Sequence, residues 1–260
     1  FIILVVRSLT LDGAMEGVRF MFVPDWSHLT WETVLLALGQ AFFTLSVGIS
    51  IMITYASYLG KNENIGGTGV NVAAMNIFIS LLAGLVIFPA VFAFGFEPDQ
   101  GPGLVFVILP AVFEQIPFGS FFLIIFFILL LFATITSAIS LLEMVVSTVI
   151  GKRRVSRART AWIVGIFIFL LGIPSALSFG SLSHITIFGR SFFDLVDFVT
   201  NNIGMPLGAL FISIFVGYYY SKQVSQTELN VSPVWYSIWR VLIRYVAPVA
   251  IIVIFIQGIS

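Results

Sequence analysis

Residues 39–58 read GQAFFTLSVGISIMITYASY, an apolar stretch of membrane-spanning length that is interrupted at its centre by SVGIS, residues 46–50. Serine side chains compete for the hydrogen bonds of a helical backbone, and glycine favours other conformations, so this centre is predicted to leave the helix. In a bilayer, non-helical backbone occurs only where it is buried in protein or lines a wet cavity. The stretch therefore predicts a small-molecule or ion site.

The composition indicates an integral membrane protein. Of the 260 residues, 59% are hydrophobic and 9% are charged, and the mean hydropathy is +1.10. A water-soluble domain of this size needs more polar surface to cover its core. The absence of cysteine excludes disulfides, iron–sulfur clusters and thiolate metal sites. Because Phe1 opens the apolar run FIILVV, we expect the chain to be the C-terminal part of a longer polypeptide.

Six apolar segments are long enough to cross a bilayer, which takes about 20 residues of helix. They are predicted at residues 33–59, 70–95, 119–150, 160–178, 188–220 and 234–258. Residues 1–9 are predicted to end a further helix, and residues 10–32 to form an aqueous loop. Residues 96–118 contain four prolines and are predicted to form a hairpin that packs on the outer face.

Basic residues predict the orientation, because cytoplasmic loops carry an excess of lysine and arginine. Lys61, Lys222 and the cluster of Lys152, Arg153, Arg154, Arg157 and Arg159 all fall on one side of the predicted spans. The opposite loops carry acidic residues, among them Asp12, Glu16, Glu97 and Asp99. We therefore expect residues 33–59 to run from outside to inside, with residues 10–32 and 96–118 extracellular.

Polar side chains at membrane depth are costly, and three predicted spans carry groups of them. Asn76 and Ser80 are four residues apart and therefore share one helical face. The others are Gln40, Thr44, Ser46, Ser50, Thr134, Thr136, Ser137, Ser140 and Glu143. A single hydroxyl often bonds only to its own helix, whereas hydroxyls and amides gathered from three helices suit a monovalent ion or a zwitterion. Metalloprotease, serine-hydrolase and P-loop motifs are missing, so we do not expect an enzyme.

Five stretches resemble the neurotransmitter:sodium symporter family. They are residues 39–58, the helix around Asn76, ATITSAIS at 133–140, DLVDF at 194–198 and RYVAP at 244–248. The resemblance implies an all-α membrane protein with the leucine-transporter-like inverted-repeat fold. Residues 1–9 would end helix 5, residues 33–220 would form the second repeat (helices 6–10, with helix 6 broken), and residues 221–260 would hold a cytoplasmic loop and helix 11. The implied partner is helices 1–5 of the same transporter.

The resemblance also implies two sodium sites. Thr44 and Asn76 match the first site, in which the substrate carboxylate takes part. The carbonyl of Ala133 and the hydroxyls of Thr136 and Ser137 match the second site. Oxygen ligands suit Na⁺ because it is a hard cation.

An amino-acid pocket around the broken helix is implied as well. The matching positions are Phe43, Thr44, Ser46, Ile49, Ser137 and Leu141, with Phe43 as an aromatic lid. The apolar side chains among them favour a neutral, apolar or aromatic amino acid. Asp197 matches the acidic member of the outer gate, and Tyr58 matches a neighbour of the inner gate.

Two positions depart from patterns common in the family. Ser80 stands where some bacterial members carry a carboxylate, so Gln40, Thr44, Asn76 and Ser80 resemble most of a chloride site. An acidic residue elsewhere in the longer protein could take the role of that carboxylate, so chloride dependence stays open. Gly151 stands where the family usually has the aspartate of the inner gate, which leaves the composition of that gate open.

The function implied is sodium-coupled import of a neutral amino acid by alternating access, in a multi-pass protein of the bacterial inner membrane. An alternative of another class is a transport-incompetent fragment that acts only as a binding or regulatory half, because each sodium site keeps only part of its ligands. The number of ions moved, the coupling to protons and dimerisation stay open.

Overall fold

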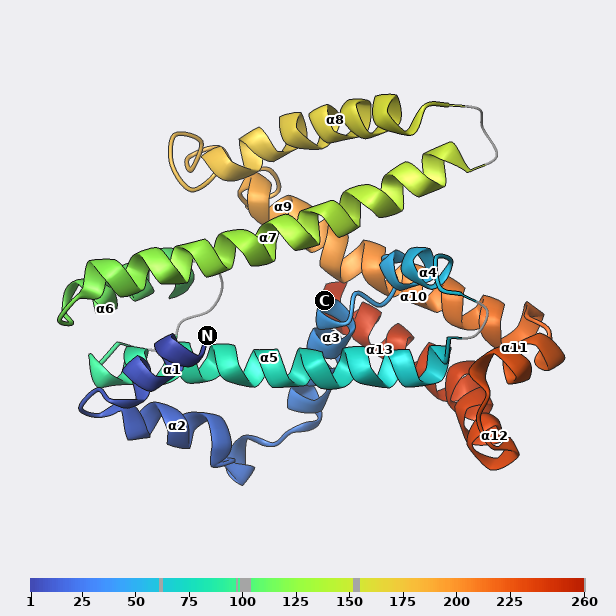
Figure 1. Cartoon of the computed structure of the whole chain (residues 1–260), viewed down its shortest axis with the longest axis horizontal. Helices are drawn as coiled ribbons and strands as arrows, with labels where there is room; N and C mark the ends of the chain where they lie inside the picture. The colour runs from blue at the N-terminus through green and yellow to red at the C-terminus, as the bar shows by residue number, and fades with distance from the viewer. Residues whose placement is uncertain (61–62, 97, 99–103, 152–154, 260) are drawn as a thin grey trace. The chain divides into compact units, whose positions relative to one another are not determined.

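The structure is a computed structural model that describes residues 1–60, 63–96, 98, 104–151 and 155–259. Apart from one isolated β-bridge between Ile187 and Arg190, the regular structure of these residues is helical (Figure 1). The chain divides into two compact units, one of Phe1–Leu29 and Asn71–Ala138 and one of Thr30–Val70 and Ile139–Ser260. The predictions for Lys61, Glu97, Asp99, Lys152, Arg153, Arg154 and residues 100–103 lie outside the described residues.

Five helices of the described chain are long and apolar enough to cross a membrane. They are α5 (Ile65–Ala93), α7 (Gly119–Ile150), α8 (Arg157–Leu177) and the composite helices Phe192–Tyr219 and Pro233–Ile259. These correspond to five of the six predicted spans. The remaining prediction, at residues 33–59, is two short helices, α3 (Trp31–Thr44) and α4 (Ile51–Ala56), neither of which reaches membrane-spanning length alone.

The first unit is built around α5 from Asn71 to its end at Ala93. It also contains α1 (Ile2–Leu9), α2 (Ala14–Phe22), η1 (Trp26–His28), the π-helical η2 (Leu104–Ile108), α6 (Leu109–Glu114) and the first part of α7. Leu4, Val91, Leu109 and Phe113 form its buried core with their neighbours. Gly17 lets α2 approach α5 closely, because a Cβ there would lie 2.5 Å from the backbone of Phe88.

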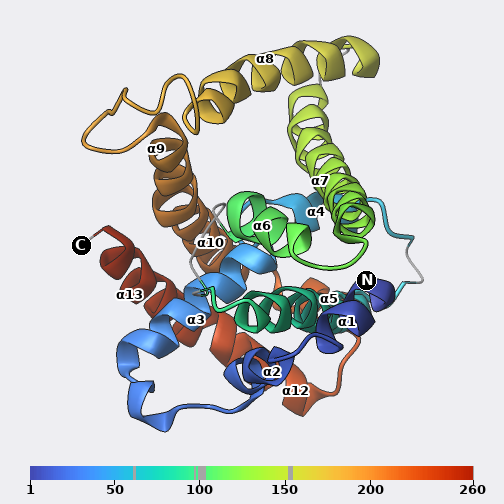
Figure 2. The same cartoon turned by 90° about the vertical axis from the view of Figure 1, so that its left-hand side faces the viewer.

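The second unit contains the broken helix and the C-terminal helices. These are α3, α4, the end of α7, α8, α9 (Phe192–Phe198), η3 (Val199–Gly204), α10 (Met205–Ile214), η4 (Phe215–Tyr219), α11 (Lys222–Leu229), α12 (Pro233–Val241), η5 (Leu242–Val246) and α13 (Ala247–Ile259). Figure 2 shows α10 beside α13, and α13 beside α3. Hydrogen bonds between helices hold this arrangement, because Asn202 donates to the carbonyl of Gly258 at 2.7 Å and Ser213 to that of Ile243 at 2.6 Å.

Two of the π-helical segments end two residues before a proline. The segment η3 precedes Pro206, and η5 precedes Pro248. Proline has no N–H to donate and its ring crowds the carbonyl four residues earlier, so the helix widens there instead of following the α pattern. The long helices are therefore continuous but locally widened near these prolines.

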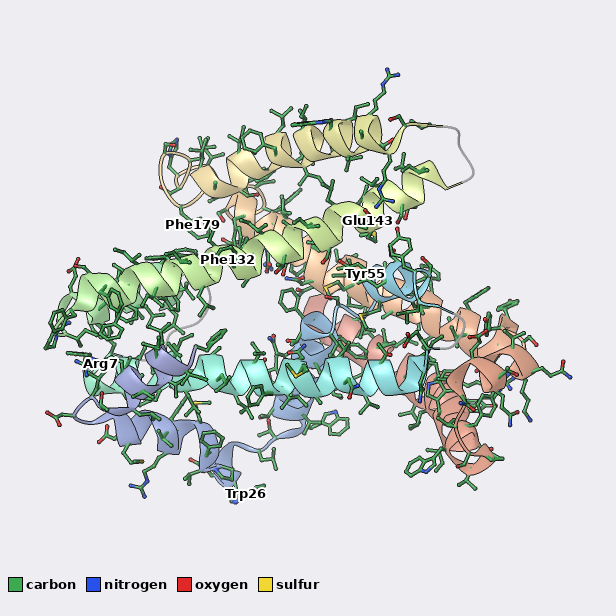
Figure 3. All side chains as sticks on the ribbon, viewed as in Figure 1. Arg7, Trp26, Tyr55, Phe132, Glu143 and Phe179 are labelled. Carbon is green, nitrogen blue, oxygen red and sulfur yellow. The ribbon has the colours of Figure 1, made fainter. Side chains whose placement is uncertain are left out.

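Apolar side chains point outward along the long helices. Phe132 on α7 is 66% exposed, and large apolar residues are exposed along all five membrane-length helices (Figure 3). Outward apolar residues on helices of this length match a lipid environment. The chain is therefore a multi-pass membrane protein.

Candidate functional site

The helix break predicted from SVGIS is confirmed. Helix α3 ends at Thr44 and α4 begins at Ile51. Three residues between or at these ends have left-handed backbone, Ser46 at φ 53°, Gly48 at φ 93° and Ser50 at φ 67°. Left-handed serine is strained, and such strain concentrates at binding sites, where the surrounding structure holds it.

The break is held against α10 by a contact between two glycine backbones. A Cβ on Gly48 would clash with the carbonyl of Met205 and lie 2.8 Å from the amide of Ala209. A Cβ on Gly208 would in turn clash with the carbonyl of Gly48. The GxxxG pattern of Gly204 and Gly208 is therefore a close-packing site at Gly208 only, since a Cβ on Gly204 would meet only Val199 of its own helix, at 3.4 Å.

The polar residues of the first predicted sodium site and of the chloride hypothesis form pairs one helical turn apart. Gln40 donates to the hydroxyl of Thr44 at 3.2 Å on α3, in the second unit. Ser80 donates to the amide oxygen of Asn76 at 3.2 Å on α5, in the first unit. Each pair presents oxygen atoms and an amide from one helical face, as the spacing predicts.

The residues predicted for the second sodium site share one turn of α7. The hydroxyl of Thr136 donates to the carbonyl of Ala133 at 2.9 Å, so two of the three predicted ligand oxygens are already adjacent. The side chains of Thr136 and Ser137 are exposed on the helix surface. Thr134 differs, because its hydroxyl donates to the carbonyl of Leu130, at 2.8 Å.

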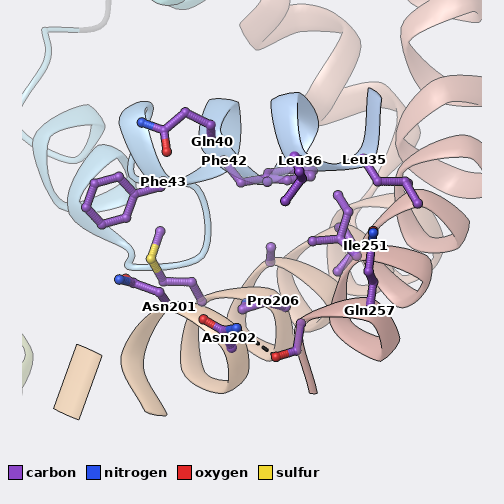
Figure 4. Close-up of a pocket in the computed structure, with 15 residues that line it drawn as sticks. Leu35, Leu36, Gln40, Phe42, Phe43, Asn201, Asn202, Pro206, Ile251 and Gln257 are labelled. Carbon is purple, nitrogen blue, oxygen red and sulfur yellow. Dashed lines mark hydrogen bonds between the residues drawn. The ribbon is translucent and has the colours of Figure 1, made fainter. Parts of the chain in front are cut away.

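A pocket of about 340 Å³ lies between α3, the η3–α10 segment and α13 (Figure 4). Gln40 and Phe43 line it from α3, and Phe43 is 50% exposed. Asn201, Asn202 and Gln257 line it from the other two helices. A mostly apolar lining with a few amides, in this range of volume, is typical of a small-molecule site.

The predicted outer-gate residue adjoins this pocket through one hydrogen bond. Asn201 donates to a carboxylate oxygen of Asp197 at 2.7 Å, one helical turn away. Asp197 is exposed, and Asn201 lines the pocket directly. Asp197 and the pocket residue Gln40 were predicted from the sequence, whereas Asn201, Asn202 and Gln257 were not, because their positions show no local pattern.

The other predicted pocket residues lie on the break and on α7. Ser46 and Ile49 are half-buried within the break, in the second unit. Leu141 is exposed on the end of α7, which also belongs to the second unit, whereas Ser137 belongs to the first.

An ion pair joins the ends of α4, α7 and α8. Glu143 accepts hydrogen bonds from the hydroxyl of Tyr58 and from Arg157, each at 2.5 Å. Tyr55 donates to Ser140, one turn before Glu143 on α7; Figure 3 labels Tyr55 and Glu143. Sequence reasoning identified Tyr58 and counted Glu143 as a polar residue, but it assigned Arg157 only to a basic cluster. Gly151, at the expected inner-gate position, has φ 36° at the end of α7.

The comparisons with known proteins agree along the whole chain. The family model described as "Sodium:neurotransmitter symporter family" matches residues 1–260. The chain is 50% identical to "Uncharacterized sodium-dependent transporter YhdH" of Bacillus subtilis, over 100% of this chain and 58% of that protein. It is 41% identical to an "Uncharacterized sodium-dependent transporter" of Haemophilus influenzae, over 98% of this chain and 56% of that protein.

A solved structure has the same fold. The structure matches that of MhsT in complex with L-phenylalanine with a TM-score of 0.89 and 45% identity, over 99% of this chain and 59% of that one. The chain thus spans somewhat under two thirds of the length of the proteins it matches.

We predict that Gly208→Ala disturbs the break and that Gly204→Ala does not. The added methyl group at residue 208 must displace the backbone of Gly48, which should cost about 1–3 kcal/mol. Because the chain has no cysteine, Val47→Cys supplies a single thiol for labelling within the break. The labelling rate is expected to change in Gly208→Ala and to stay unchanged in Gly204→Ala; equal rates in both variants would contradict the assigned contact.

Proposed function

Because the chain belongs to the sodium:neurotransmitter symporter family, we propose that it supplies the second inverted repeat of a transporter that imports a neutral, apolar or aromatic amino acid with Na⁺ by alternating access. The leucine-transporter-like, all-α fold is shared with MhsT. The relatives are longer than this chain, so the proposal concerns the natural protein in its full length.

The broken helix is the observation that carries this proposal. The helix α3 ends in turn-like hydrogen bonds, because the N–H groups of Ser46 and Val47 donate to the carbonyls of Phe43 and Phe42. The helix dipole makes this end negative. Such an end can hold a cation or the ammonium group of an amino acid. The contact of Gly48 with Gly208 keeps the break in place without a side chain between the two backbones.

The sodium part of the proposal rests on α7. The carbonyl of Ala133 and the hydroxyl of Thr136 are adjacent, and Ser137 follows directly. Exposed hydroxyls on a membrane-length helix are costly against lipid, so we infer that a polar surface covers them in the full-length protein. Their oxygens would hold Na⁺ there, between α7 and the surface that covers it.

We predict that Thr136→Ala weakens sodium-dependent uptake. Losing one hydroxyl ligand should lower the apparent affinity for Na⁺ by about tenfold or more, as is typical of a lost bond to a charged group. The measurement is uptake of labelled amino acids into proteoliposomes that carry the full-length protein, over a series of Na⁺ concentrations with K⁺ as replacement.

Thr134→Ala is the matched control, because it removes the same side chain two residues away on the same helix. Its sodium dependence is expected to remain that of the unchanged protein, since its hydroxyl bonds to Leu130 and not to Ala133. Uptake that needs no Na⁺ in a folded, unchanged protein would overturn the symporter proposal and favour a binding or regulatory role.

The substrate class follows from the residues around the break. Phe43 and Ile49 are apolar, and the pocket beside Phe43 is lined by apolar groups and amides without a charged side chain. MhsT, the 45% identical neighbour, was solved with L-phenylalanine. These observations favour a substrate with an uncharged side chain.

We therefore expect unlabelled phenylalanine and leucine to compete with labelled phenylalanine for uptake, and lysine and glutamate not to compete. A charged side chain would lose its hydration in an apolar pocket without a counter-charge, which is unfavourable. Equal competition by lysine would disprove this substrate class while leaving sodium coupling intact.

We propose that the ion pair of Glu143 and Arg157 closes the inner end of the transport path. It would act instead of the inner-gate aspartate of the family, whose position Gly151 occupies in this chain. It ties α4, the inner half of the broken helix, to α7 and α8 through Tyr58. An alternating-access cycle needs a contact at this end that can open, and an ion pair with a 63% exposed arginine can exchange its partner for water.

We predict that Glu143→Lys lowers uptake severalfold and that adding Arg157→Glu restores most of it, because the exchanged charges attract each other again. Arg159→Gln, an exposed charge change two residues away, should have little effect. A double variant as inactive as the single one, despite an unchanged melting temperature, would show that the pair does not act as a closure.

A further inference from the structure

Arg244 is a cation inside a membrane-length helix, and no carboxylate of the described residues forms an ion pair with it. It is the twelfth residue of Pro233–Ile259, about 16 Å from the start of the helix. Glu143 and Arg157 form the one ion pair found in the described part of the chain, so Arg244 has no such pair there. Its Nε is also the one buried side-chain nitrogen or oxygen atom of the described residues that has no hydrogen-bond partner.

The backbone around Arg244 is fixed against the end of the preceding long helix. Pro248 cannot donate to the carbonyl of Arg244, and the hydroxyl of Tyr218 donates to it instead, at 3.2 Å. Gly217 allows this approach, since a Cβ there would lie 3.1 Å from the Cα of Arg244. The position of this arginine is therefore set by packing and by hydrogen bonds.

Two tyrosine rings hold the guanidinium group. Its central carbon lies 4.4 Å from the ring centroid of Tyr218 and 5.5 Å from that of Tyr245. Stacking of this kind orients the flat face of the group and leaves its N–H edge for an acceptor. The arginine is thus arranged to bind an anion and not merely to extend into water.

Two further basic residues, Arg240 and Lys222, are linked to each other through Tyr236 near Arg244. Arg240, one turn earlier on α12, donates to the hydroxyl of Tyr236 at 2.9 Å, and that hydroxyl donates to the carbonyl of Lys222 at 3.2 Å. We call Lys222, Arg240 and Arg244 the α12 basic surface. Glu228 on α11 is the nearby acidic residue, so the surface keeps an excess of positive charge.

Aromatic residues and an apolar groove accompany these charges. Tyr219 ends one membrane-length helix and Trp235 lies near the start of the next, and both are exposed, as is typical of the level where lipid headgroups meet the hydrocarbon. A groove of about 530 Å³ adjoins the basic surface at Ser225 and Trp239. Apart from Ser225 and Glu228, the groove is lined by apolar and aromatic residues, among them Ile53, Phe211, Phe215 and Tyr220. Figure 1 shows α11 beside α12 at this end of the second unit.

We propose that the α12 basic surface binds an anionic phospholipid, with the phosphate between Arg240 and Arg244 and one acyl chain along the groove. Basic pockets between membrane helices on the cytoplasmic side bind anionic headgroups, and positive charge predicts that side here. A lipid supplies both the anion and the apolar chain that this surface lacks. The site is separate from the residues proposed to bind Na⁺ and the amino acid.

The test compares phosphatidylglycerol with phosphatidylcholine. The full-length protein in neutral detergent is titrated with each lipid, and bound lipid is counted by native mass spectrometry. Phosphatidylglycerol is expected to bind more tightly, and Arg240→Gln and Arg244→Gln are each expected to weaken its binding about fivefold. Arg159→Gln, which removes the same charge from α8 on the same predicted side, should leave the binding unchanged.

Two results would overturn the proposal. One is equal binding of the two lipids by the unchanged protein, as expected if another part of the full-length protein covers the surface. The other is unchanged phosphatidylglycerol binding in the double variant Arg240→Gln, Arg244→Gln. If Arg244→Gln lowers the melting temperature in phosphatidylcholine, then Arg240→Gln alone decides, because Arg240 lies outside the contact with Gly217 and Tyr218.

Discussion

The approach of the Gly48 backbone to the Gly208 backbone is the contact on which the second unit depends. Within a bilayer, lipid tails are as apolar as leucine, so helices associate through close packing and polar contacts more than through hydrophobic burial. Backbone that leaves the helix must also lie beside protein or a wet cavity. A glycine on each side meets both conditions, because it lets a left-handed segment rest directly on α10.

The rule that irregular backbone must lie beside protein or a wet cavity also applies to the helices that contain prolines. Pro206 and Pro248 interrupt the hydrogen-bond pattern of two long helices, and the widened segments η3 and η5 precede them. Tyr218 takes the carbonyl that Pro248 leaves without an intrahelical donor. The widened η3 places Asn201 on the pocket and lets Asn202 bond to Gly258. Sites that bind polar groups thus lie where the membrane helices are locally irregular.

Much of the fold and part of the site could be predicted from local sequence. The break followed from serine and glycine within a few residues, and the adjacency of Ala133 and Thr136 followed from their spacing on a helix. Three of the pocket amides could not be found in this way, because Asn201 and Asn202 lie on η3 and Gln257 lies on α13, and only packing brings them together with Phe43. The partner of Glu143 was missed for a similar reason, since Arg157 lies beyond the end of α7.

The sequence by itself determined that this chain is a helical membrane protein, where most of its spans lie, and that one of them is broken. These properties depend on hydropathy and backbone preference, which act over one or two helical turns. Only the tertiary structure decided that Gly208 and not Gly204 is the packing glycine and that Arg157 pairs with Glu143. It also decided that Arg244 lies against two tyrosine rings without a counter-charge in the described residues. Those outcomes depend on which helical faces meet, and the spacing of residues along one helix carries no information about its neighbour.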